Sequence, residues 1–571
     1  MEKVILYQLF TRLFGNQNTT CQPHGTLSEN GCGKMEDIDV KTLKRIRQLG
    51  ATHIWFTGII RHATQTDYTA YGIPRQHPAV VKGKAGSPYA IADYYDVDPD
   101  LAVNIDDRMN EFERLVDRTH RQGMKVVIDF VPNHVARQYC SVAKPDGVID
   151  LGVGDVKGMH FSTRNNFYYC WGQPFQPSID LYAGEKQPYM ESPARATGND
   201  CFSACPNVND WYETVKLNYG VDYCDAGGRS EHFDPIPDTW NKMTEILLFW
   251  AAKGIDAFRC DMAEMVPTAF WSWAIDKVKY QYPHIKFIGE VYDPNQYRNY
   301  IAAGFDWLYD KVGMYDCVKA VMCRHCDAAQ ITRQWQATDD ILEHMLYFLE
   351  NHDEQRIASP QFAGDARRGI PALVTNVLMG RNPFMLYAGQ EFGEPALDAE
   401  GFSGADGRTT IFDYWTVDSL RRGYFDRRKL TADEKALEKT YIKVLNMANA
   451  HEAVTDGLFY DLAYVNGSIN QQVFPFIRKS DNETLLVLAN FSDTDIEAPV
   501  VLPRHAFDYL QLAEGVFPAV DLLSGKKHVF ALHADTPCAL TVPANGAVVL
   551  QFILNSLPKI TTQHDASIEC S

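Results

Sequence analysis

Short apolar segments recur along the chain from its first residues to about position 390, and most are followed by a stretch with helical periodicity. The segments are rich in β-branched and aromatic residues and too short for buried helices, so they predict strands. They are ILYQLF (5–10), HIWFTGI (53–59), KVVIDFV (125–131), GIDAFRCD (254–261), IKFIGEV (285–291), FDWLYD (305–310), MLYFLEN (345–351) and PFMLYAG (383–389). Strands alternating with helices in this way predict an α/β fold, a parallel (β/α)8 TIM barrel.

Two stretches depart from this alternation. Residues 135–235 separate the third and fourth strands by far more than a crossover needs and are rich in Gly, Pro, Asn, Tyr and Cys, which predicts an inserted domain B. After a predicted helix over 432–450, short apolar segments between turn residues predict a C-terminal antiparallel β-domain over 452–555. The barrel is then expected over 1–134 and 236–451, and the polar residues 556–571 are expected to form a loose tail.

Composition narrows the partners and the compartment. A formal net charge of −19 disfavours nucleic acid and anionic membranes as partners. The first residues, MEKVILYQLF, predict a strand rather than a signal peptide, and no run reaches the roughly 20 apolar residues of a membrane span. The 13 cysteines are odd in number and have no repeated spacing, which favours free thiols. We therefore expect a cytoplasmic protein.

The predicted strand GIDAFRCD carries two charges on a face that begins apolar. With a period of two, one face carries Ile255, Ala257, Arg259 and Asp261, and the other carries Asp256, Phe258 and Cys260. Buried charges are usually paired, so a structural ion pair between Arg259 and Asp261 is one interpretation. A functional site at the end of the strand is the other.

Other predicted strands favour the functional interpretation, because they also end in polar side chains. These are Asp129, Asn133 and His134 after the third strand, Glu290 after the fifth, and Asn351, His352 and Asp353 after the seventh. Active sites of parallel barrels lie at the carboxyl ends of the strands. Several carboxylates on one rim repel each other and do nothing for folding, so we predict a functional site there.

These strand ends resemble the signature regions of the α-amylase superfamily, glycoside hydrolase family 13. The four regions are DFVPNH (129–134), GIDAFRCD (254–261), GEVYD (289–293) and ENHD (350–353), in the order that the family has. GSPYAIADYYDVDP (86–99), GQEFGEP (389–395) and GRTTIFDY (407–414) also look like segments of the family. The resemblance extends over about residues 3–555 and includes the inserted domain and the C-terminal β-domain.

The resemblance implies a role for each residue at the rim. Asp261 matches the catalytic nucleophile, Glu290 the general acid and base, and Asp353 the third carboxylate, which holds sugar hydroxyls. The substrate-binding residues that it implies are Tyr89, whose ring would stack on a glucose, His134, Arg259 and His352. Asp129 matches an acid that supports the arginine from behind.

The chemistry of these residue types agrees with those roles. A guanidinium two residues from Asp261 on the same face should lower the pKa of that carboxyl and keep it ionised. Glu290, which faces other carboxylates, is expected to have a raised pKa suited to a general acid. Retaining glycosidases need two carboxyl groups about 5–5.5 Å apart, a separation that neighbouring strand ends about 4.8 Å apart can supply.

Two departures from the family pattern affect specificity and metal binding. Many members have a Lys-His pair where this chain has Glu264 and Met265, a reversal of charge beside the leaving-group sugars. Asn207, in PNVN, stands where many members have an aspartate, and Asn133 is the other candidate ligand for a structural calcium. The chemistry itself requires no cofactor. Trp171 and Trp211 suit either a sugar platform or the core of the inserted domain.

Together these features predict a retaining hydrolase of α-1,4-glucosidic bonds in starch-derived maltooligosaccharides. A transglycosidase and an α-1,6-, sucrose- or trehalose-acting member of the same family are the alternatives, because water and sugars compete for one glycosyl-enzyme. A non-catalytic glucan-binding relative is a remote alternative, since all three carboxylates are present. The large insertion and Glu264 favour short soluble chains over long polymers.

Overall fold

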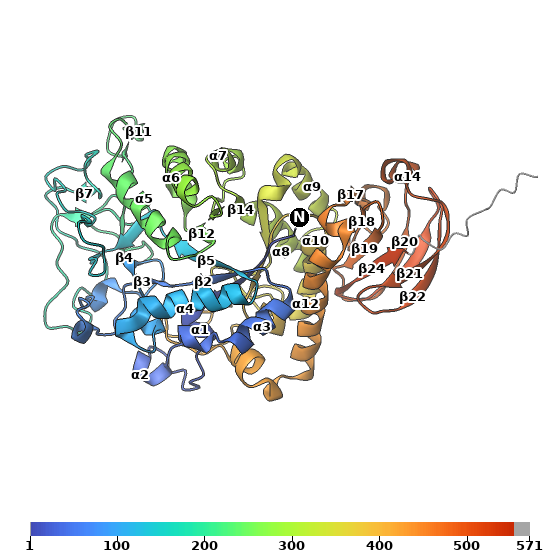
Figure 1. Ribbon diagram of the computed structural model, residues 1–571, viewed down its shortest axis with the longest axis horizontal. Helices are drawn as coiled ribbons and strands as arrows, with labels where there is room; N and C mark the ends of the chain where they lie inside the picture. Colours follow the sequence, from blue (N-terminus) through green and yellow to red (C-terminus); the bar gives the residue numbers. More distant parts are fainter. Residues whose placement is uncertain (1, 553–571) are drawn as a thin grey trace, which may run out of the picture.

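A computed structural model describes residues 2–552 of the chain, and its centre is a closed barrel (Figure 1). All eight pairings between neighbouring barrel strands are parallel, and each predicted segment contains one strand. The strands are β1 (Ile5–Phe10), β2 (His53–Thr57), β5 (Lys125–Phe130), β12 (Ala257–Cys260), β13 (Lys286–Gly289), β14 (Trp307–Tyr309), β15 (Met345–Phe348) and β16 (Phe384–Tyr387). The predicted (β/α)8 barrel is confirmed, and the predicted tail over 556–571 lies outside the described residues.

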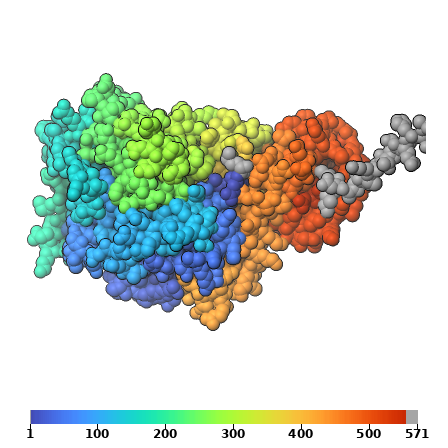
Figure 2. Space-filling model, viewed as in Figure 1, coloured from blue at the N-terminus to red at the C-terminus, as the bar shows by residue number. Residues whose placement is uncertain are grey.

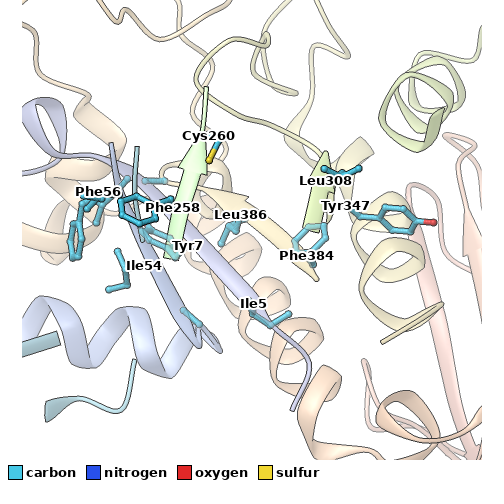
Figure 3. Close-up of a cluster of buried hydrophobic side chains, with 14 of the residues drawn as sticks. Ile5, Tyr7, Ile54, Phe56, Phe258, Cys260, Leu308, Tyr347, Phe384 and Leu386 are labelled. Carbon is cyan, nitrogen blue, oxygen red and sulfur yellow. The ribbon is translucent and has the colours of Figure 1, made fainter. Parts of the chain in front are cut away.

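The strands are buried on both faces, which explains their nearly continuous apolar sequences. Inside the barrel, side chains from alternate positions pack on one another, among them Leu6, Trp55, Val127, Ala257, Ile288, Leu346 and Met385. The other face packs against the surrounding helices and includes Ile5, Tyr7, Ile54, Phe56, Phe258, Cys260, Leu308, Tyr347, Phe384 and Leu386 (Figure 3). The alternation places Arg259 on the inner face with Ala257. Ile255 precedes β12 and packs in the outer cluster, so the expectation that it shares the face of Arg259 is wrong.

Amphipathic helices surround the barrel. Between β2 and β5 lies α4 (Arg108–Arg121), which buries Phe112, Leu115 and Val116. The helix predicted over 432–450 is α12 (Ala432–Ala450), whose first turn is closed by a capping box between Thr431 and Glu434. The other helices of eight or more residues are α3 (Val40–Leu49), α5 (Asp238–Ala251), α6 (Thr268–Gln281), α9 (Gln330–Ala337) and α10 (Gly369–Leu378). Within residues 2–552, no helix has the length and apolarity needed to cross a membrane.

The long insertion begins directly at the rim of the barrel. Its first strand, β6 (His134–Ala136), starts four residues after β5 ends and pairs antiparallel with β9 (Thr214–Lys216). Four further elements are two-residue strands, β7 (Tyr169–Cys170), β8 (Ala194–Arg195), β10 (Val221–Asp222) and β11 (Ser230–Glu231). A second excursion, β3 (Ile60–His62) and β4 (Ile91–Val97), follows β2. The insertion forms one end of the molecule, opposite the C-terminal strands (Figure 1).

The C-terminal strands form a sandwich that appears as a lobe at the other end of the molecule (Figure 2). A six-stranded antiparallel sheet contains β17 (Leu458–Asp461), β18 (Val473–Lys479), β19 (Thr484–Asn490), β24 (Gly546–Phe552), β21 (Gly515–Asp521) and β22 (Lys527–Leu532). A second sheet pairs β20 (Ile496–Val500) with β23 (Cys538–Val542). One face of the larger sheet, including Phe474, Val487 and Val549, continues the outer core of the barrel, while Leu486, Leu488 and Leu550 face the second sheet.

Candidate active site

The register of three barrel strands brings the predicted site residues together. Arg259 on β12 lies opposite Asp129 on β5 and Ile288 on β13. The ladder continues past the strand ends, because the N–H of Asp261 donates to Phe130 O at 2.9 Å and the N–H of Glu290 donates to Cys260 O at 3.2 Å. Asp129, Asp261 and Glu290 therefore surround Arg259 at the carboxyl end of the barrel, where the sequence places them.

Arg259 is fully buried and joins three carboxylates. Its Nη1 lies 2.9 Å from Asp261 Oδ1 and 3.4 Å from Asp129 Oδ1, and its Nη2 lies 2.8 Å from Glu290 Oε2. Asp129 is held from the other side by Trp55 Nε1, which donates to Oδ2 at 2.9 Å. One fixed cation thus sets the positions of the two predicted catalytic carboxylates, and Asp129 supports that cation as expected from the resemblance.

The electrostatics of Asp261 differ from the expectation. Burial raises the pKa of Asp261 well above its ordinary value, and Glu290, Asp353 and Asp129 add to the rise, while Arg259 opposes it. Arg259 acts to lower the pKa of Asp261 as predicted, but burial and the neighbouring carboxylates outweigh it, so the expectation that this pKa lies below its ordinary value is wrong.

Glu290 has donors on both carboxylate oxygens. Tyr292 Oη donates to Oε1 at 2.6 Å, and the backbone N–H of Met262 donates to Oε2 at 2.8 Å. Met262 adopts a left-handed conformation with φ of 44°, which costs about 1 kcal/mol for a residue with a side chain. The strained turn directly after Asp261 aims an N–H at Glu290 and so couples the two carboxylates through the backbone as well as through Arg259.

Glu264 hydrogen-bonds to the backbone of the segment that carries Tyr292. Its Oε2 accepts from the backbone N–H groups of Tyr292 at 2.7 Å and Asp293 at 3.2 Å. The residue that replaces the family's lysine therefore fixes the segment that carries Tyr292. It does not line the pocket that holds the carboxylates.

Asp353, His352 and Tyr89 form the other side of the site. His352 Nε2 lies 2.6 Å from Tyr89 Oη and 3.0 Å from Asp353 Oδ2, and the two rings stack with centroids 5.2 Å apart. Burial acts to raise the pKa of Asp353, but His352 and Arg259 outweigh it and hold the pKa below its ordinary value. Gln8, a polar residue on the inner face of β1, contacts His352 Nδ1 at 2.7 Å. The sequence analysis did not select Gln8, although a glutamine inside an apolar strand is a signal.

His134 lies where the insertion leaves the barrel. Burial, with Lys216 and Lys82 adding to it, lowers the pKa of His134 to about 3, so its imidazole is neutral near pH 7. A neutral imidazole can both donate to and accept from a hydroxyl. The Trp211 ring lies 5.3 Å from His134 and lines the pocket, whereas Trp171 is 59% exposed on the insertion.

One pocket of about 350 Å³ joins these groups. Asp261, Glu290, Asp353, Tyr89 and His134 line it. Its remaining lining residues are Lys82, Ser87, Trp211, Glu213, Thr214, Met262, Tyr292, Ile411 and Phe412. The volume is at the lower end of the range for small-molecule sites, so the pocket suits a ligand of a few sugar rings at most.

The predicted calcium ligands do not fit a metal ion. Asn133 Oδ1 accepts from Lys216 Nζ at 2.7 Å, and the same ammonium lies 2.5 Å from Asp200 Oδ1. Asn207 is exposed, and its Oδ1 accepts from the N–H of Asn209 at 2.8 Å. No group of three or more His, Cys, Asp or Glu residues within 2–552 is arranged to hold a metal. An ammonium already occupies the place between Asn133 and Asp200, so the nomination of Asn133 and Asn207 as calcium ligands is not supported.

We expect chelation to leave the stability of the protein unchanged. Lys216 is 2% exposed and bridges β9 to Asn133, so Lys216→Met should lower the free energy of unfolding by about 3 kcal/mol through loss of a buried charge pair. Thermal melts with EDTA and with CaCl₂ provide the measurement, and the exposed Lys186→Met is the control. A wild-type midpoint that falls in EDTA and recovers with calcium would contradict the assignment.

The chain is similar to known proteins over most of its length. The model of the α-amylase catalytic domain matches residues 8–217. An α-amylase of Streptomyces lividans is 25% identical over 566 residues, which cover 89% of this chain and 55% of that protein. A cyclomaltodextrinase of a Bacillus species is 23% identical and covers 86% of this chain and 73% of its own length. The structure of the α-amylase of Geobacillus thermoleovorans with acarbose has a TM-score of 0.62 at 17% identity, covering 97% of this chain and 99% of that one.

The fold and the site define a (β/α)8-barrel protein with a carboxylate cluster at the carboxyl face of the barrel. Over residues 8–217 this chain matches the α-amylase catalytic domain, and over most of its length it is similar to an α-amylase and a cyclomaltodextrinase. It spans about half the length of the Streptomyces relative.

Proposed function

We propose that the protein is a retaining glycoside hydrolase that cleaves α-1,4-glucosidic bonds in maltooligosaccharides. The observation that carries the proposal is that Arg259 holds both Asp261 and Glu290, two carboxylates that line one pocket. Two carboxylates beside a bound sugar are the requirement for glycoside hydrolysis, one to act on the anomeric carbon and one on the departing oxygen. A purely glucan-binding relative would have no use for this arrangement.

In the proposed reaction, a carboxylate oxygen of Asp261 forms a bond to the anomeric carbon while the bond from that carbon to the glycosidic oxygen breaks. Glu290 gives its proton to the departing oxygen. In the second step Glu290 removes a proton from water, the water oxygen bonds to the anomeric carbon, and Asp261 leaves as a carboxylate.

Short, soluble glucans are the substrate class that we favour. The pocket of about 350 Å³ is small, and its polar groups surround a single region. The relatives' names, α-amylase and cyclomaltodextrinase, indicate α-linked glucans. The name cyclomaltodextrinase indicates cyclic substrates as a competing possibility. Transfer to sugars is the other competing function. The 12 cysteines within residues 2–552 are all free, which supports a reducing compartment such as the cytoplasm.

Product analysis tests the function directly. Chromatography after incubation with maltoheptaose, pullulan, isomaltose, sucrose and trehalose should show cleavage of the first and little of the others. On a ladder of maltooligosaccharides, we expect kcat/KM to level off by maltoheptaose, since binding energy from remote sugars helps only where subsites collect it. A kcat/KM that keeps rising on longer chains would indicate an endo-acting amylase. Products longer than the substrate would indicate transglycosylation.

The stereochemistry of the first product is a separate prediction. Two displacements at the same carbon, by Asp261 and then by water, return the original configuration. Proton NMR during the first minutes should therefore show the α-anomer before mutarotation. An initial β-anomer would mean a single displacement and would exclude Asp261 as a covalent nucleophile.

A further inference from the structure

Two oppositely charged side chains face each other in the wall of the catalytic pocket. Lys82 Nζ lies 3.0 Å from Glu213 Oε2, and the side chains are only 11% and 6% exposed. Both residues line the same pocket as Asp261 and Glu290. Neither belongs to the signature regions of the sequence, and the mechanism described above does not use them.

The pair lies on the side of the pocket formed by the insertion. Glu213 directly precedes β9, whose Thr214 is the register partner of Ala136 on β6, and its carbonyl accepts from the N–H of Arg137 at 3.0 Å. Lys82 follows a 3₁₀ turn (Pro78–Val80) and lies 5.2 Å from the ring centroid of Tyr212. The acid Glu290 and its neighbour Tyr292 come instead from the loop after β13. The pair therefore lies on the same side of the pocket as His134, while Glu290, the proposed acid for the leaving group, comes from a different segment.

The hydrogen-bonding capacity of the pair is not used up within the described residues. An ammonium has three donors, and within the described residues Lys82 Nζ directs one of them at Glu213. Glu213 Oε2 is buried without a well-aligned hydrogen bond. Burial raises the pKa of Glu213, and Lys82 opposes that rise. A buried ion pair with unused hydrogen-bond donors and acceptors destabilises the folded protein unless a polar ligand forms the missing hydrogen bonds.

We propose that Lys82 and Glu213 bind a hydroxyl group of the sugar whose anomeric carbon reacts, or of the sugar next to it on the non-reducing side. One hydroxyl can accept a hydrogen bond from Nζ and donate one to Oε2, which satisfies both partners. Because the two charges cancel, the pair selects a neutral polyhydroxyl ligand rather than an anion. This inference rests on the proposed function and makes the pair a specificity determinant of that reaction.

Monodeoxy substrates test the proposal. With wild type, one of the p-nitrophenyl α-maltosides that each lack one hydroxyl of the maltosyl group should lose about 10- to 100-fold in kcat/KM through the missing contact with the pair, separately from the losses on deoxy sugars that lack a contact with Asp353 or His134. Lys82→Met and Glu213→Gln should each lose a similar factor on the parent sugar. They should lose little more on that one deoxy sugar, because the contact is already gone.

The control is Lys84→Met, on the same segment. Lys84 Nζ contacts Gln65 Oε1 at 3.0 Å and lines a different hollow that contains none of the catalytic carboxylates. It should keep the wild-type discrimination among deoxy sugars. A merely structural role for the pair would instead lower activity by the same factor on every sugar, and that outcome would overturn the proposal. Glu213→Gln keeps the shape of the side chain and preserves the test if Lys82→Met does not fold.

Failure of the reaction is distinguishable from failure of the pair. Maltotriose binding by titration calorimetry is measured on wild type, Lys82→Met and Lys84→Met. If wild type binds maltotriose without hydrolysing it, and only Lys82→Met binds it more weakly, the proposed function would be refuted and the hydroxyl site would be retained. Hydrolysis with an unchanged deoxy profile in both pair variants would refute the hydroxyl site and keep the function.

Discussion

Replacement of Asp261 by asparagine is expected to reduce hydrolysis of maltoheptaose by about four orders of magnitude, equivalent to about 5.4 kcal/mol of activation free energy. The amide keeps the shape of the side chain and can still accept from Arg259, but it cannot form the glycosyl ester or leave as a carboxylate. Release of reducing sugar measured over hours provides the rate. Because the substitution removes a charge from a crowded cluster, the thermal midpoint should not fall.

The control for this variant is Asp276→Asn, an exposed aspartate on α6, which should behave as wild type. The pH profile supplies a second measurement. A raised pKa means that Asp261 becomes ionised only above the ordinary aspartate range, so kcat/KM should rise with pH through that raised value. More than about a tenth of wild-type activity in Asp261→Asn would leave only about 1.4 kcal/mol for the residue, too little for a covalent nucleophile.

Replacement of Glu290 by glutamine is the second large effect, and it should depend on the leaving group. We expect a loss of about 1,000-fold on maltooligosaccharides, whose sugar leaving group needs a proton. On α-maltosyl fluoride the loss should be small for the first step, because fluoride departs without one. Tyr292→Phe removes only the hydroxyl that donates to Glu290 Oε1 and is the matched control, with a much smaller effect.

Burst kinetics with α-maltosyl fluoride separate the two roles of Glu290. If Glu290 also activates water, the glycosyl-enzyme should accumulate in Glu290→Gln and appear by mass spectrometry as one added maltosyl group. Equal losses on the fluoride and on maltoheptaose would show that Glu290 does not act as the acid.

The barrel could be predicted because the sequence pattern identifies its strands. Each is a short apolar run, and strand alternation alone assigns Arg259 and Asp261 to the inner face beside Ala257. The convergence of Asp129, Asp261 and Glu290 followed from the general position of polar residues at the carboxyl ends of parallel strands. These inferences depend on local pattern, which a single sequence contains.

What the sequence analysis missed depends on which segments meet. Lys82, Glu213 and Tyr292 come from irregular stretches whose mutual distances have no periodic signature. The pKa of Asp261 follows from its burial and from the number of carboxylates that share one guanidinium, neither of which spacing along the chain reveals. For the same reason the sequence suggested Asn133 as a metal ligand, because it does not show that Lys216, 83 positions further on, lies beside Asn133.

The attachment of the C-terminal sheet limits how the gene can be shortened. Phe474 and Val487 lie in the same apolar cluster as Leu373 and Val377 on α10. Ending the chain after α12 would expose that side of the barrel to water and leave an apolar surface patch that favours aggregation. A truncated form is then expected to accumulate in inclusion bodies, so work on the catalytic part in isolation calls for a redesigned surface on α10 rather than a simple stop codon.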